Sequence, residues 1–357
     1  MHKLKTILAG LLCALLITAG CQTVQPEPSA SPTPEATPEI VLEPKVTQTP
    51  EPTAEPLNLS TTTGLPTTLD YRPVEVMVEN SPEARPQSGF NQADVIYEAY
   101  VEGQITRFML VYATQLPPEK VGPVRSARIY YLDLAQEWDG IYTHFGGAND
   151  PNASNVYKKF KQITLRGHLD GMTEKNYFWR DSSRKSPHNA YVNISEVTNL
   201  YGNGVKMPQK PRQFANFRGG SDAPLAGESV QTLTLPYSSF NKVIYTYNAD
   251  TGLYSRAIGN KPFTDKETGK QCTAANIIVQ YAKHGSYNDK AGHISIGLVG
   301  SGNAEYYCDG VMRKGTWEKT SETAQTVFKD EDGKVITLAP GNTYVQIVPT
   351  NFKVTRG

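Results

Sequence analysis

The chain has 357 residues, of which 35 are basic and 35 are acidic, so its formal charge at neutral pH is balanced. A balanced chain argues against a nucleic-acid-binding protein, because such proteins need a basic surface to face the phosphates. The length leaves room for a leader, a linker and about two domains of ordinary size.

The N-terminus has the features of an export signal. Basic residues precede an apolar run at 7–19, which is too short to span a bilayer comfortably and predicts a signal peptide over residues 1–20. The run ends in "ITAGC", which resembles a bacterial lipobox and predicts lipid attachment at Cys21 on the extracytoplasmic face of the cell membrane. Thr18 departs from the leucine usual in that pattern, and an ordinary secretory signal is the alternative.

A linker follows the signal. Residues 21–65 consist almost wholly of Pro, Glu, Thr, Ser and Ala, as in "QPEPSASPTPEATPEI". Such a composition cannot bury a core, so we expect a disordered stretch. Its prolines favour extended geometry, and it is predicted to act as a tether on the order of 100 Å long.

Strand and helix patterns alternate over residues 66–205. "RPVEVMVEN" places three valines on one face of a strand, and "ADVIYEAYVEG" and "ITRFMLVYAT" are further apolar segments, the second predicted as a strand. The stretch "VGPVRSARIYYLDLAQEW" predicts an amphipathic helix starting near residue 121. "GIYTHFGG" then predicts a strand, and "NASNVYKKFKQI" a short helix with an Asn cap. The order predicts a mixed α/β domain.

Helical periodicity disappears in the second half. Residues 206–227 are polar and rich in Pro and Gly, and they are predicted to connect two domains. Residues 228–357 contain short strand patterns separated by turn sequences such as "NADTG" and "KDEDGK". The fold class expected is α+β or α/β, with a smaller, mainly antiparallel β domain at the C-terminus.

Two cysteines lie in the exported part outside the lipobox. Cys272 and Cys308 both fall in predicted strands, and the exported location permits a disulfide. A cross-strand bridge between them and two buried free thiols are both compatible with the sequence.

Arginines gather around the predicted helix. Arg125 and Arg128 fall in its first turn, where the helix dipole and unpaired N–H groups favour an anion over a cation. Glu98 and Glu102 lie four residues apart, which predicts one shared face and offers an internal partner for the pair. Further arginines occur nearby, so the guanidinium groups outnumber these glutamates and an anionic ligand can take the remainder. These further arginines are Arg85 and Arg107.

Two histidines stand in places where ligands are often found. His144 ends a predicted strand and precedes two glycines, as expected beside a crevice at the strand ends of an α/β sheet. The segment "FWRDSSRKSPHNAYV" adds Arg180, His188 and Asn189, a density of donors that suggests contact with a polar ligand. A hydrogen-bonded structural role is the alternative for each histidine.

Enzyme signatures are mostly missing from the sequence. "SSRK" matches a serine-nucleophile spacing but lacks its partner motifs, and the histidines are too scattered for a zinc site. We therefore predict no metal and no cofactor. A wall-modifying hydrolase or transferase, with Glu98, Glu102 or His144 as catalytic groups and an arginine-bound substrate, is the rival hypothesis.

Longer stretches resemble a known family. "ENSPEARPQSGFNQADVIYEAYVEGQITRF", "GPVRSARIYYLDLAQEWDGIYTHFGG" and "YSRAIGNKPFTDKETGKQCTAANIIVQ" are similar to the YerB-like bacterial lipoproteins that carry DUF3048, a domain of unknown function. The resemblance covers the chain after the tether and implies a two-domain envelope lipoprotein, with no established reaction. The leading hypothesis is an anchored protein that binds an anionic or polar wall component, or a partner protein, through the arginines.

Overall fold

The computed structural model describes residues 58–69, 71–198, 212–219 and 222–357. The predicted signal peptide, Cys21 and residues 22–57 of the predicted tether lie outside these ranges, as does part of the predicted connection. Residues 55–357 form one compact unit.

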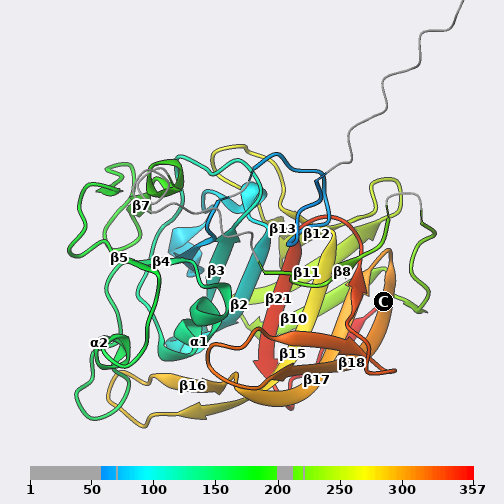
Figure 1. Cartoon of the computed structure of the whole chain (residues 1–357). Helices are drawn as coiled ribbons and strands as arrows, with labels where there is room; N and C mark the ends of the chain where they lie inside the picture. The colour runs from blue at the N-terminus through cyan, green and yellow to red at the C-terminus, as the bar shows by residue number, and fades with distance from the viewer. Residues whose placement is uncertain (1–57, 70, 199–211, 220–221) are drawn as a thin grey trace, which may run out of the picture. The chain divides into compact units, whose positions relative to one another are not determined.

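A 12-stranded sheet runs through this unit in the order β19-β18-β17-β15-β21-β2-β3-β1-β4-β5, with β9 beside β18 and β16 beside β15. Its strands are β1 (Val74–Glu79), β2 (Val95–Tyr100), β3 (Thr106–Tyr112), β4 (Ile141–His144), β5 (Gly167–Asp170), β9 (Glu228–Ser229), β15 (Asn276–Ser286), β16 (Ile294–Gly297), β17 (Gly300–Cys308), β18 (Val311–Lys319), β19 (Val327–Asp330) and β21 (Thr343–Pro349). The sheet joins the two halves of the sequence, because β21 pairs in parallel with both β2 and β15 (Figure 1).

A second, six-stranded sheet is wholly antiparallel and contains β10 (Thr232–Ser238), β11 (Asn241–Asn248), β12 (Leu253–Ile258), β13 (Lys261–Pro262), β14 (Thr273–Ala274) and β22 (Thr355–Arg356). Two short pairs complete the strands: β6 (Phe178–Arg180) with β7 (Ala190–Val192), and β8 (Asn216–Phe217) with β20 (Thr337–Leu338). The predicted turn "NADTG" connects β11 and β12.

Helices are few in the described ranges. They are α1 (Ile129–Trp138), α2 (Val156–Phe160), the single-turn 3₁₀ segments η1 (Pro82–Ala84), η2 (Phe90–Gln92) and η3 (Glu102–Gln104), and a helical stretch at 194–198. The Asn155 side chain caps α2 by accepting a hydrogen bond from the Lys158 amide, as predicted. The expected N-terminal α/β domain is only partly borne out, because strands dominate the fold and β3 runs antiparallel between β1 and β2.

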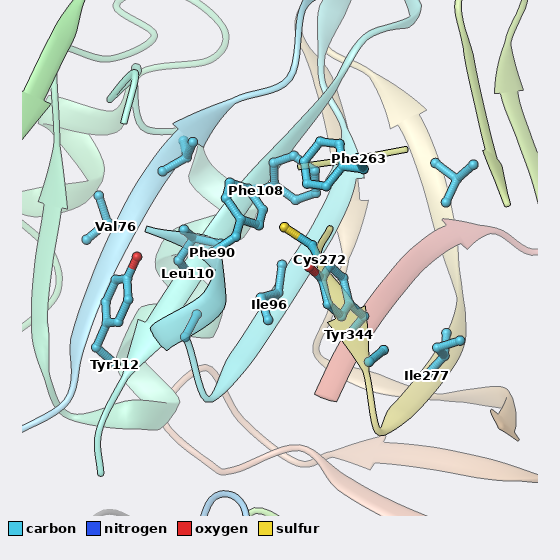
Figure 2. Packing of buried hydrophobic residues seen from close by; sticks show 14 of the residues in the cluster. Val76, Phe90, Ile96, Phe108, Leu110, Tyr112, Phe263, Cys272, Ile277 and Tyr344 are labelled. Atoms are coloured by element: carbon cyan, nitrogen blue, oxygen red, sulfur yellow. The ribbon is translucent and has the colours of Figure 1, made fainter. Parts of the chain in front are cut away.

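Both faces of the central strands of the long sheet, β1, β2, β3 and β21, are buried. Val74, Val76 and Val78 point to one face, where they join a core shared with Leu233 and Tyr245 of the second sheet. Figure 2 shows part of this core. The residues on the predicted stripe of α1 pack in a separate core on the other face; they are Ala127, Tyr131, Leu134, Ala135 and Trp138. Strands covered on both sides explain why β2 and β3 have continuous apolar sequences.

The start of α1 corrects one prediction. The helix begins at Ile129 rather than near residue 121, with Arg128 as its N-cap residue in an extended conformation. The preceding segment is extended because it pairs with β1: the Arg125 amide donates to the Met77 carbonyl over 2.9 Å. Arg125 is therefore not in the first turn, and the helix-dipole argument does not apply to it.

Candidate functional site

Six parallel strands end along one edge of the long sheet. The strands β1, β4 and β5 run in parallel, and so do β2, β21 and β15. Because β3 is antiparallel to both β1 and β2, all six point the same way. Glu79, His144 and Asp170 are the last residues of β1, β4 and β5. The carboxyl edge of such a sheet is where ligands are commonly bound.

Glu79 and Arg107 lie opposite each other at this edge. They are register partners on β1 and β3, and each is only 5% exposed. Their side chains share the face of Met77 and Met109, which belongs to the core under α1. A carboxylate and a guanidinium thus enter the edge from neighbouring strands, on the helix-covered face.

Two predicted residues converge on Glu79 from distant segments. Arg125 Nε lies 3.3 Å from Glu79 Oε2, and His188 Nδ1 lies 3.0 Å from the same oxygen. Ser81 Oγ also approaches His188 Nδ1, at 3.5 Å. The Arg125 side chain stays 27% exposed and that of His188 23%, so solvent reaches this part of the edge.

Arg128 is held by Glu102. Its Nε donates to Glu102 Oε2 over 3.0 Å, its Nη2 donates to Oε1, and its Nη1 donates to the Ala127 carbonyl over 2.8 Å. Burial alone would raise the pKa of Glu102, but the hydrogen bonds and charge of Arg128 outweigh it and lower that pKa to about 2. This is the internal ion pair that the sequence offered as an alternative to a ligand.

Arg107 has no carboxylate of its own. Nη1 donates to the Ser126 carbonyl over 2.6 Å, whereas Nε is buried without a hydrogen-bond partner in the part of the chain described. Burial, with the nearby Arg128 charge, lowers the pKa of Arg107 to about 10. Three guanidinium groups, those of Arg107, Arg125 and Arg128, therefore lie with two carboxylates, those of Glu79 and Glu102, on the α1 face of this edge. We call these three residues, with Glu79, Glu102 and His188, the arginine cluster.

The opposite face of the same strands holds a separate network. Glu98 accepts hydrogen bonds from Asn80 Nδ2 at 3.1 Å, Thr106 Oγ1 at 2.7 Å and Arg256 Nη2 at 2.8 Å. Both Glu98 and Arg256 are completely buried. Glu98 and Glu102 therefore do not share a face, contrary to the prediction, because β2 ends between them and η3 turns Glu102 toward α1.

Arg85 belongs to this second network rather than to the arginine cluster. Its guanidinium donates to the Asn80 side chain over 3.0 Å and to the Asn80 carbonyl over 2.8 Å. Further bonds reach the Phe240 carbonyl and Asn241 Oδ1. Partial burial lowers the pKa of Arg85 to about 10. With four acceptors already in place, Arg85 joins the β10–β11 turn to the loop after β1.

His144 is buried where the sequence predicted it, at the end of β4. Its Nε2 lies 2.5 Å from His168 Nε2, and its Nδ1 lies 2.7 Å from the Gly146 carbonyl and 4.0 Å from Asp170 Oδ1. Burial outweighs the attraction of Asp170 and lowers the pKa of His144 to about 4. The imidazole is neutral at physiological pH and orders the glycine loop beside Ser126.

Arg180 and Asn189 brace one loop. Arg180 Nη1 donates to Asn189 Oδ1 over 2.7 Å, and its guanidinium lies over the Phe145 ring at 4.8 Å. Asn189 Nδ2 donates to the carbonyls of Asp181 and Arg184. The residues of the predicted polar segment thus lie in two places: His188 contacts the arginine cluster, whereas Arg180 and Asn189 stabilise the β6–β7 hairpin.

The two cysteines are free and buried, so the disulfide that the sequence left open does not form. Cys272 lies in the core beside Phe263 and Tyr344 (Figure 2), while Cys308 ends β17 next to Arg313 Nη2 at 3.8 Å. The two segments are not strand partners. Burial raises the pKa of the Cys272 thiol to about 12 and also raises that of Cys308.

The sequence interpretation missed two central residues. Glu79 was overlooked, although the alternation that puts Val74, Val76 and Val78 on one face also puts Glu79 on the other. Arg256 was overlooked because nothing local indicates that this residue of β12 crosses to Glu98. Within the described ranges no group of His, Cys, Asp and Glu is arranged to hold a metal ion, and no helix there is long and apolar enough to cross a bilayer.

Comparisons with known proteins agree with this architecture. Residues 62–205 match the model of "Protein of unknown function (DUF3048) N-terminal domain", and residues 233–345 match the corresponding C-terminal domain. The chain is 35% identical over 297 residues to a Bacillus subtilis protein named "Putative lipoprotein YerB", across 80% of this chain and 85% of that protein. This chain belongs to the DUF3048 family.

A solved structure supports the DUF3048 assignment. The crystal structure of YerB from Bacillus subtilis matches with a TM-score of 0.71 at 30% identity, covering 84% of this chain and 99% of that one. The strand-rich fold of this DUF3048 chain is therefore shared with an experimentally determined relative. The family description names no reaction and no ligand.

Proposed function

We propose that this DUF3048 protein is a lipid-anchored envelope protein that binds an anionic group, a carboxylate or a phosphate, of a wall polymer or a partner protein. The arginine cluster forms the binding site. Anchoring at Cys21 is supported by the lipobox-like "ITAGC" and by the lipoprotein name of the relative. The Pro-rich stretch would hold the folded unit away from the membrane.

The observation that carries the proposal is the surplus of guanidinium groups at the carboxyl edge. Arg128 is fully engaged with Glu102, and Glu79 is shared between Arg125 and His188. Arg107 is left buried without a carboxylate, and a buried charge is seldom left uncompensated. An incoming anion would complete the cluster and accept charge-assisted hydrogen bonds from Arg107 and Arg125.

The rival hypothesis is an enzyme with Glu98, Glu102 or His144 as a catalytic group, and the contacts of these residues favour it less than binding. Glu98 is completely buried and accepts three hydrogen bonds, and Glu102 is bound in a bidentate pair. A general acid or base must reach the substrate proton, directly or through one water. Glu98 and His144 have no solvent contact, and Glu102, whose side chain is 27% exposed, is engaged by Arg128.

Binding of isolated wall polymers to the full chain tests the proposal. Arg125→Ala removes a partly exposed guanidinium and should weaken binding of muropeptides or teichoic acid about tenfold, the value of one charge-assisted hydrogen bond. Arg166→Ala is the matched control, because Arg166 is 61% exposed and pairs with Asp139 just before β4, at the opposite edge of the sheet. Equal affinity of Arg125→Ala and the native chain for every polymer would refute the proposal.

A further inference from the structure

One tryptophan stands apart from the other two. Trp138 and Trp317 are 4% and 2% exposed and belong to the core on the α1 face, whereas Trp179 is 39% exposed. Trp179 lies in the middle of β6, in the short β6–β7 hairpin. A large apolar ring left in solvent on a strand is a candidate for ligand contact.

The Trp179 ring is held in place by a neighbouring aromatic ring. It stacks on the buried Tyr191 with ring centroids 6.0 Å apart and an interplanar angle of 25°. Lys120 Nζ lies 4.7 Å from the centroid of the same Tyr191 ring, and it also pairs with Asp181 at 3.0 Å. Tyr191, itself packed against Lys120, therefore orients the indole before any ligand arrives, which lowers the entropy cost of binding.

A cavity of 540 Å³ borders Trp179, between the hairpin and the loop around Lys120. Gln92, Glu119, Asn193 and Glu267 contribute to its wall. The side chains of Gln92 and Glu119 make no hydrogen bond to another described residue, so their donors and acceptors are available to a ligand. Glu267 already accepts a hydrogen bond from Ser88 Oγ over 2.7 Å.

A smaller cavity of 240 Å³ borders Trp179 as well, and its wall includes Phe145, Lys175 and Arg180. Phe145 also contacts the backbone beside the arginine cluster, because its amide donates to the Arg125 carbonyl over 3.1 Å. Trp179 thus lines two cavities. Two cavities that share one aromatic residue suit a chain of repeating units better than a single compact molecule.

We infer that Trp179 and the two cavities beside it bind an uncharged saccharide chain. The apolar C–H face of a pyranose ring packs on the electron-rich face of an indole. The planar amides and carboxylates of Gln92, Asn193 and Glu119 can bond its hydroxyl groups, in the way that a few polar groups orient a ligand in an apolar pocket. This site goes beyond the arginine cluster, since it recognises sugar rings and not an anion.

Titration of the full chain with the soluble β-1,4-linked tetramer of N-acetylglucosamine tests the inference. Because Trp179 is the exposed tryptophan, a saturable change in tryptophan fluorescence at millimolar tetramer reports on this site directly. Calorimetry should show binding about tenfold weaker in Trp179→Ala, whereas Trp179→Phe should retain part of it. Phe240→Ala is the matched control, because Phe240 is an aromatic residue 41% exposed in the β10–β11 turn.

Two outcomes would overturn the inference: no saturable binding by the native chain, or equal binding by Trp179→Ala and the native chain. Thermal unfolding should show that each variant is folded, since the substituted side chains are exposed. The probe carries no charge, so Arg125→Ala should bind it like the native chain. Saccharide binding at Trp179 and anion binding at the arginine cluster are therefore tested independently, and failure of one leaves the other unaffected.

Discussion

Arginine and glutamate side chains occur on both faces of the carboxyl edge of the long sheet, but their surroundings differ. On the face toward the second sheet, Glu98 and Arg256 form a pair with no solvent contact, and four neutral acceptors hold the Arg85 guanidinium beside them. On the face toward α1, Arg107 lacks a carboxylate and Arg125 reaches solvent. The bonding of the guanidinium groups and their access to solvent, rather than the mere presence of arginine, separate a structural network from a candidate binding site.

The closed face should respond most strongly to mutation. Arg256→Met leaves Glu98 buried without its cation, and the free energy of unfolding should fall by about 3–5 kcal/mol. The loss should be large because the guanidinium also lies over four aromatic rings, with Phe263 nearest at 4.8 Å. Urea unfolding followed by circular dichroism measures the change.

A double variant tests whether the loss of stability comes from the unpaired charge of Glu98. Adding Glu98→Gln to Arg256→Met removes the unpaired charge, so the double variant should lose less stability than Arg256→Met alone. A loss under about 1 kcal/mol in the single variant would mean that this pair does not hold the two sheets together.

The open face should show its charge pairing in the pH dependence of stability. The pKa of Glu102 is about 2 in the folded chain, below its ordinary 4.5, so the folded state favours the carboxylate. This contribution is present above pH 4.5 and is lost as the pH falls toward 2. Glu102→Gln should remove about 2 kcal/mol of that pH-dependent stability, because its Arg128 pair is largely buried.

Thermal unfolding at several pH values between 5 and 2 checks this, with Glu322→Gln as control. Glu322 pairs with Lys159 on the surface at 2.6 Å with 47% of its side chain exposed, and such pairs contribute little. Parallel pH profiles for Glu102→Gln and the native chain would show that Arg128 is available for another partner.

Local sequence patterns predicted where the strands and helices lie better than they predicted which of these elements contact one another. The alternation in β1 and the apolar stripe of α1 follow directly from periodicity. Periodicity also placed His144 at the carboxyl edge. The start of α1 was predicted too early because the residues before it pair with β1, a contact that no local pattern encodes.

The pairing of charges depended on tertiary structure. Spacing could not tell which glutamate faces which arginine, because that depends on where β2 ends and on the approach of β12 from the other half of the chain. The parallel pairing of β2 with β21 joins segments nearly 250 residues apart, at 95–99 and 343–347. Arg128 with Glu102 was foreseen as one of several pairs, whereas Arg125 with Glu79 and Arg256 with Glu98 were not.

The most direct measurement is nuclear magnetic resonance of the arginine side chains during titration with inorganic phosphate. Arg107 and Arg125 should show saturable shifts of their Nε–H signals, because an anion would complete the arginine cluster. Arg256 should stay unchanged, since its guanidinium is buried against Glu98. Equal, non-saturating shifts at all arginines, or none at Arg107 and Arg125, would contradict an anion site at this edge of the sheet.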